Sequence, residues 1–185
     1  MIGSHNSMSY LPPKNLLGKI TRLWNKCQDK TIEEQVNAGI DYFDIRIDFY
    51  SDNNWHFVHN RVDYGIIDKT IWKYIGETNL PVRVIYDRRS KPKDCAHEAH
   101  CFEIYLWYIR RKYNVNIDSA ITYWDWKEHY KPLIEVKEFH ASVSSKWYQY
   151  LLGCKWFANK YNTFGKDITM NDLTSINEVL LLDYV

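Results

Sequence analysis

Histidine is the side chain best suited to move protons at neutral pH, and this chain has seven of them: His5, His56, His59, His97, His100, His129 and His140. His5 follows Gly-Ser at the end of a short first segment, and His59 closes the extended run 55–59. Two imidazoles that converge could serve as a general base and a general acid. Alternation along an extended run places His56 opposite His59, so spacing alone does not decide which of them faces a site.

A predicted strand at 41–48 lies between these histidines and carries charges where a buried strand is normally apolar. One face is apolar and the other is charged: Phe43, Ile45, Ile47 and Phe49 alternate with Asp44, Arg46 and Asp48. Buried charges must be paired or must line a solvated cavity. The strand is therefore either an exposed edge with an outer salt bridge or one wall of an active-site mouth.

The remaining pattern predicts the elements that would position these residues. We expect helices at 31–39, 66–75, 95–113 and 144–161, and strands at 55–59, 82–86, 120–126, 133–139 and 178–185. Alternating strands and helices are typical of an α/β fold with parallel strands. The 185 residues suit one domain, 1–185, whereas a full (β/α) barrel needs about 250. We therefore expect an abbreviated or irregular TIM-type (β/α) barrel.

Composition narrows the class of partner. The net charge of +1 argues against a nucleic-acid binder. No run approaches the roughly 20 apolar residues of a membrane span, and 1–10 lacks the order of a signal peptide. We expect a cytoplasmic protein, and its four cysteines, Cys27, Cys95, Cys101 and Cys154, are predicted to be free thiols.

The segment 95–101 places two histidines between Cys95 and Cys101 and looks like a metal site. On a helix, His97 and Cys101 would share a face. No second ligand pair at zinc-site spacing occurs elsewhere in the chain, so a solvated helix start is the favoured interpretation.

Four segments, in this order, resemble the X-domain of phosphatidylinositol-specific phospholipase C: 2–7 (IGSHNS), 35–46 (QVNAGIDYFDIR), 57–59 (FVH) and 180–185 (LLLDYV). These match a strand ending in a histidine, a helix-to-strand unit, a second strand ending in a histidine, and a closing strand with an aspartate. They cover the first 60 or so residues and the last ten or so. The region 90–177 shows no resemblance.

The resemblance implies a role for each matching residue. It makes His5 the general base, His59 the general acid, and Asp183 the carboxylate that orients His5. Arg46 stands where the metal-independent bacterial branch has the arginine that meets the phosphate, and where the calcium-dependent branch is acidic. Asp44 fits both branches.

Two further positions are assigned to substrate binding. Asn6 departs from the bacterial pattern, which often has Asp there, and agrees with the calcium branch. Arg88, in the Asp87-Arg88 pair, matches a position that is Lys in one branch and Glu in the other. The expected enzyme is thus a phosphodiesterase without a cofactor, although calcium or magnesium could bind at Asn6, Asp44 and Asp87.

The expected reaction is attack by a neighbouring hydroxyl to give a cyclic phosphate, with attack by water as the alternative. The substrate would be a phosphatidylinositol-like lipid or a soluble diester, with transient contact to a membrane surface. Aromatic residues suit such a surface or the core, and the candidates are Trp124, Trp126, Trp147 and Trp156. Two other functions stay open: a metal-dependent glycerophosphodiester phosphodiesterase, and a phospholipid- or phosphate-binding module without turnover.

Overall fold

The computed structural model describes residues 1–88, 91–124, 127–130, 134–138 and 178–182. Its helices are α1 (Leu16–Asn25), α2 (Ile32–Asn37), α3 (Lys69–Thr78) and α4 (Cys95–Tyr113), and its strands are β1 (Ile2–Ser4), β2 (Tyr42–Phe49), β3 (Trp55–His59), β4 (Val62–Ile66), β5 (Val82–Tyr86), β6 (Ile117–Thr122), β7 (Lys127–Tyr130), β8 (Glu135–Glu138) and β9 (Glu178–Leu182).

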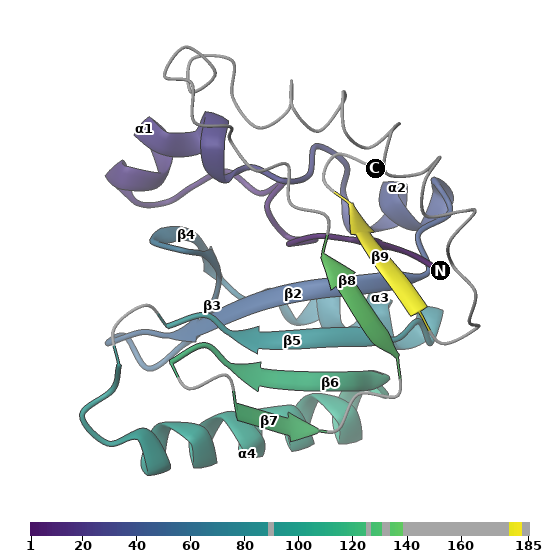
Figure 1. The fold of residues 1–185 in the computed structure, drawn as a ribbon. Coiled ribbons are helices and arrows are strands. Elements are labelled where there is room, and N and C mark those ends of the chain that lie inside the picture. Colours follow the sequence, from purple (N-terminus) through teal and green to yellow (C-terminus); the bar gives the residue numbers. More distant parts are fainter. Residues whose placement is uncertain (89–90, 125–126, 131–133, 139–177, 183–185) are drawn as a thin grey trace.

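The strands form one mixed sheet in the order β7-β6-β5-β2-β1-β9-β8 (Figure 1), and the β3–β4 hairpin branches off β2. Strands β8, β9, β1, β2, β5 and β6 run parallel, whereas β3, β4 and β7 are antiparallel to their neighbours. Among the described strands, β7 and β8 end the sheet without closing it. The α/β class is therefore confirmed, whereas a closed barrel is not.

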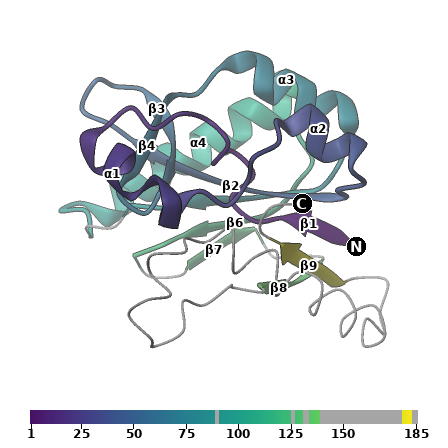
Figure 2. The same ribbon diagram turned by 90° about the horizontal axis from the view of Figure 1, so that it is seen from above.

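Helices α2, α3 and α4 lie on one side of the sheet (Figure 2), over the apolar face predicted for β2. Phe43, Ile45 and Ile47 are fully buried there with apolar residues of β5 and α4. Helix α3 is fastened to α4 where Trp72 Nε1 donates to Tyr105 Oη over 2.8 Å. Burial of these large side chains is the main favourable contribution to this layer.

The other face of the same strands is polar, yet it is also buried. Asp44 of β2 is the register partner of Arg83 of β5, which is paired in turn with Ser119 of β6. All three side chains are buried, as is Arg46 two residues further along β2. The exposed-edge alternative for this strand is therefore wrong.

Local sequence explains the helix starts. Thr31 and Glu34 form the capping box expected at the start of α2, and Gly39, at φ +89°, follows its end. The predicted helix 66–75 is shifted to 69–78, because Ile66 still belongs to β4 and Asp68 supplies the N-cap.

Other predictions need correction. Helix α1 and strands β4 and β7 were not expected, and the predicted strand 120–126 begins earlier and ends at Thr122. The predicted strand 133–139 is β8, and the last strand is described over 178–182. The predicted helix 144–161 lies outside the described residues, as do Trp126, Trp147 and Trp156.

Gly76 lets α3 approach the end of α4 closely. A Cβ atom at this position would lie 1.7 Å from the carbonyl oxygen of Tyr113, which is backbone and cannot rotate away. We expect Gly76→Ala to lower the free energy of unfolding by about 1–3 kcal/mol, despite the higher helix propensity of alanine. Urea denaturation checks this, with Lys73→Ala at an exposed position of α3 as the control. An unchanged or raised stability for Gly76→Ala would contradict the packing described.

Candidate active site

His5 is fixed by its backbone at the point where β1 ends. Its N–H donates to the carbonyl of Leu182 at the end of β9 over 2.9 Å. Its own carbonyl accepts from Gln28 Nε2 over 3.1 Å, and the same amide donates to Leu182 O over 2.9 Å. The buried Gln28 thus links the ends of β1 and β9 by hydrogen bonds and fixes the backbone from which the His5 ring projects.

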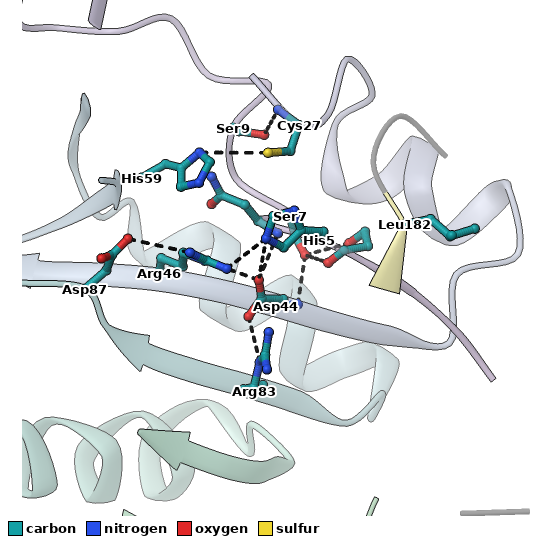
Figure 3. Close-up of polar contacts among 12 residues, drawn as sticks. His5, Ser7, Ser9, Cys27, Asp44, Arg46, His59, Arg83, Asp87 and Leu182 are labelled. Carbon is teal, nitrogen blue, oxygen red and sulfur yellow. Dashed lines mark hydrogen bonds and ion pairs between the residues drawn. The ribbon is translucent and has the colours of Figure 1, made fainter. Parts of the chain in front are cut away.

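Asp44 and Arg46 project from β2 toward this ring (Figure 3). Arg46 Nη2 lies 2.8 Å from His5 Nε2, and because a guanidinium can only donate, Nε2 is the acceptor. Asp44 Oδ2 accepts from the Asn6 N–H over 3.0 Å and lies 3.4 Å from Arg46 Nε. The predicted base and the predicted phosphate-binding cation are therefore in direct contact.

His59 reaches the same place from the β3–β4 hairpin. Its ring is 5.9 Å from that of His5, edge to face at 86°. Its Nδ1 lies 2.8 Å from the carbonyl of Asn25 at the end of α1, and 3.8 Å from the Cys27 thiol. A carbonyl can only accept, so Nδ1 carries the proton and Nε2 carries the lone pair of the neutral ring.

The other histidine of β3 lies outside this cluster. His56 is held between Asp63 (2.9 Å) and Asp52 (3.0 Å) and stacks on Tyr50. The ladder between β2 and β3 ends at the Ile47–Phe57 pair, two residues before His59. Beyond that pair β3 continues to pair with β4, and its register shifts between Phe57 and Val58. Alternation along β3 alone therefore does not decide which of the two histidines faces the site.

The site shifts the ionisation of two of these groups. Burial opposes the charge on Asp44, but Arg83, Arg46 and His5 outweigh it and hold the pKa of this carboxyl far below its usual range. Burial, together with Arg46 and His5, lowers the pKa of His59 well below its ordinary value. In the free protein, Asp44 is therefore ionised and His59 is neutral at pH 7.

Asp87 and Asn6 complete the cluster. Asp87 Oδ2 lies 3.8 Å from Arg46 Nη1 and accepts from the Asn60 N–H over 3.0 Å. Asn6 has φ +43° and is fully buried, yet neither atom of its side-chain amide has a hydrogen-bond partner among the described residues. An unpaired buried amide is costly, and this one follows His5 directly.

The remaining predicted residues lie elsewhere. Arg88 Nη1 donates to Glu98 of α4 over 2.6 Å and lies 3.5 Å from the Tyr86 hydroxyl. Asp183 falls outside the described residues, although Leu182 just before it binds the His5 N–H. Trp124 packs in the core, with its ring 4.9 Å from that of Tyr86.

Three residues that were not predicted from the sequence support the site through contacts to Asp44 and to the two histidines. Arg83 Nε donates to Asp44 Oδ1 over 2.8 Å, and Gln28 and Asn25 fix the two histidines. Arg83 carried a signal, since it is a charge within the β-branched run 82–86. Asn25 acts through its backbone carbonyl, which no side-chain pattern reveals.

The carboxylates of the cluster are engaged by guanidinium groups. Arg46 and Arg83 both donate to Asp44, and Arg46 also approaches Asp87. Within the part of the chain that is described, no group of three or more His, Cys, Asp or Glu side chains is arranged to hold a metal ion. This includes the 95–101 segment, where His97 Nε2 and Cys101 Sγ are 3.6 Å apart. Cys27, Cys95 and Cys101 are all free thiols.

Solved structures that match this fold include phosphatidylinositol-specific phospholipases C. The enzyme from Listeria monocytogenes matches with a TM-score of 0.63 at 14% identity, over 100% of this chain and 87% of that one. A pentafluoro-Phe form of the Staphylococcus aureus enzyme gives 0.63 at 16%, over 100% and 85%. A third, from work on modulating the membrane binding of the S. aureus enzyme, gives 0.60 at 14%, over 100% and 85%.

No protein-family model matches the chain, and no curated protein matches its sequence. At identities of 14–16% the likeness establishes a shared fold. The resemblance expected from four short motifs is thus confirmed at the level of structure. The roles of individual residues stay predictions.

The ionisation of His59 can be measured directly. Because Arg46 is one cause of its lowered pKa, Arg46→Met should raise the pKa of His59, and an anion bound beside Arg46 should do the same. NMR titration of the imidazole signals of the folded protein gives both values. Arg111→Met, at an exposed position of α4, serves as the control and should leave the His59 titration unchanged. A His59 that titrates identically in the wild type and in Arg46→Met would rule out this electrostatic contact.

Proposed function

We propose that this protein is a phosphodiesterase that cleaves a phosphatidylinositol-like lipid or a related diester by histidine acid–base catalysis. The observation that carries the proposal is the convergence of three groups from distant segments. The rings of His5 and His59 lie 5.9 Å apart, and Arg46 lies 2.8 Å from His5. Such an arrangement offers a base, an acid and a cation around one phosphoryl group.

In the first half of the reaction, His5 accepts the proton of the attacking hydroxyl through Nε2. In the free protein this nitrogen accepts from Arg46. A phosphoryl oxygen that binds Arg46 takes over that donor and leaves Nε2 available as a base. We assign attack to a neighbouring hydroxyl of the substrate, which forms a cyclic phosphate, with water attack as the alternative.

In the second half, His59 protonates the departing alkoxide. The ring is neutral in the free protein because burial, Arg46 and His5 all disfavour its charge. A bound phosphodiester brings a negative charge that offsets Arg46, which raises the pKa of His59 and lets it hold the proton that the leaving group needs. Substrate binding thereby favours the protonated form of His59, which is the proposed general acid.

Two further residues support this chemistry. The Asn6 amide is buried and unpaired beside the cluster, so we assign it to a phosphoryl oxygen as a donor. Asp183 follows the residue whose carbonyl binds the His5 N–H, and we assign it to the orientation of His5, by analogy with other carboxylate–histidine pairs.

We propose that the reaction needs no metal ion. A metal at Asn6, Asp44 and Asp87 would have to displace two arginines from Asp44 and one from Asp87. Neutralisation of the phosphoryl charge is instead assigned to Arg46. Turnover that persists in EDTA supports this assignment, whereas turnover lost in EDTA and restored by calcium or magnesium points to a metal-dependent glycerophosphodiesterase.

The catalytic pair is tested by His5→Ala and His59→Ala. Acid–base catalysis contributes about 10²–10⁴-fold, so each variant should lose at least 100-fold in kcat on phosphatidylinositol vesicles or a soluble inositol phosphodiester. Circular dichroism confirms that each variant is folded, and His100→Ala on the exposed face of α4 is the matched control. A folded double variant that keeps its activity would end the assignment. A wild type that binds inositol phosphate without turnover would identify a binding module.

A lipid substrate requires a surface that meets the membrane, and α1 offers one beside the site. Leu16 and Ile20 expose 73% and 65% of their surface, and the helix contains Lys19 and Arg22 but no acidic residue. Its last residue, Asn25, binds His59. Among the described helices none is long and apolar enough to cross a membrane.

The double change Leu16→Ser/Ile20→Ser tests this contact. It should weaken sedimentation with phosphatidylinositol-containing vesicles by about 10-fold or more, because exposed apolar area drives interfacial binding. Turnover of a soluble diester should not change. The matched control is Ile104→Ser/Trp107→Ser, two comparably exposed positions on α4, which should bind vesicles as the wild type does. The reverse pattern would place the membrane-facing surface on α4.

A further inference from the structure

A second buried guanidinium lies behind the candidate site. Arg83 is the register partner of Asp44 on the neighbouring strand, and its Nε donates to Asp44 Oδ1 over 2.8 Å. The side chain is only 6% exposed, so a bound substrate does not reach it readily. The opposite oxygen of Asp44 accepts from the Asn6 N–H and lies 3.4 Å from Arg46 Nε (Figure 3).

The charges around Arg46 explain why a second cation is needed. Arg46 lies within 4 Å of two carboxylates, Asp44 at 3.4 Å and Asp87 at 3.8 Å. Asp44 is ionised, so with Asp87 as a carboxylate these three groups would sum to a net charge of −1. A phosphodiester is itself an anion, and it would be repelled from such a cluster.

Arg83 changes that sum to zero, because its charge offsets the charge of Asp44. On its far side the cluster continues through polar groups, with the Tyr42 hydroxyl 3.0 Å from Asp118 and 3.5 Å from Ser119. The burial of all these groups makes the interactions stronger than they would be in water.

We propose that Arg83 is a positioning residue that acts through Asp44: by neutralising this carboxylate, it removes the net negative charge around Arg46 that would otherwise repel a phosphoryl group. The inference rests on the proposed function and adds to it the source of the anion affinity. A purely structural role for Arg83 is the alternative. Strands β2 and β5 also pair at four register positions besides Asp44–Arg83, and buried ion pairs contribute little net stability on average.

The test measures the binding of inorganic phosphate by calorimetry, together with kcat and KM on a soluble inositol phosphodiester. Arg83→Met should weaken phosphate binding by about 10-fold or more. The loss of kcat/KM should appear mainly in KM, because the phosphate is charged both in the ground state and in the transition state. Arg83→Lys keeps the charge and should restore most of the affinity, and Arg111→Met on the exposed face of α4 should change nothing.

A charge-balanced double variant separates the proposed role from a structural one. Arg83→Met alone leaves Asp44 with an unpaired oxygen and could fail to fold. Asp44→Asn/Arg83→Met removes both charges and keeps a side chain of the same shape beside Asn6 and Arg46. If Arg83 acts by neutralising Asp44, the double variant binds phosphate more tightly than a folded Arg83→Met variant. If Arg83→Met does not fold, the double variant is compared with the wild type and should bind phosphate within about 3-fold of it.

The outcomes are distinguishable. A folded Arg83→Met that binds phosphate as the wild type does overturns the inference and leaves the proposed function intact. The inference is also overturned if the folded double variant binds phosphate no better than Arg83→Met. If Arg83→Met is unfolded, a folded double variant that has lost phosphate binding overturns the inference as well. A wild type that neither binds phosphate nor cleaves the diester overturns the proposed function, and the inference with it.

Discussion

The site depends on one fully buried carboxylate. Asp44 is withdrawn from water at the centre of the sheet, where an unpaired charge would be very costly. The surrounding structure satisfies it with donors from three segments: the Asn6 N–H after β1, Arg46 on its own strand and Arg83 on β5. The same contacts that make its burial tolerable fix the residue next to His5 and the cation that we propose binds the phosphoryl group. Stability and chemistry are therefore coupled at this position.

Arg46 illustrates how one charge can control two steps. It donates to His5 Nε2 and helps to keep His59 neutral, so in the free protein it occupies the nitrogen of the proposed base and keeps the proposed acid unprotonated. A phosphodiester bound to Arg46 would reverse both effects at once. In the proposed mechanism the reactive protonation state would therefore form only with substrate in place, as a consequence of a guanidinium that acts on both imidazoles.

Part of this arrangement could be predicted from the sequence, because the signal was local. The polar face of β2 stood out against its apolar neighbours, and Thr31 and Glu34 marked the start of α2. The hairpin was missed, although Asn60 in a two-residue turn after His59 is a recognisable signal. Helix α1 was missed because Leu16 and Ile20 face solvent, so their spacing marks no core. The choice between His56 and His59 depended on where β3 leaves β2, which is a tertiary property that alternation cannot report.

Arg83 shows why the charge balance of a site is harder to predict than its reactive groups. The pair Asp44 and Arg46 appears balanced when it is considered alone, with one negative and one positive side chain. Only the fold brings Asp87 to the other side of Arg46 and turns the local balance negative. The compensating charge must come from a strand that packs against Asp44, and the register of β5 places Arg83 there. The affinity of such a site for an anion is thus a property of the sheet, distributed over strands that no short motif spans.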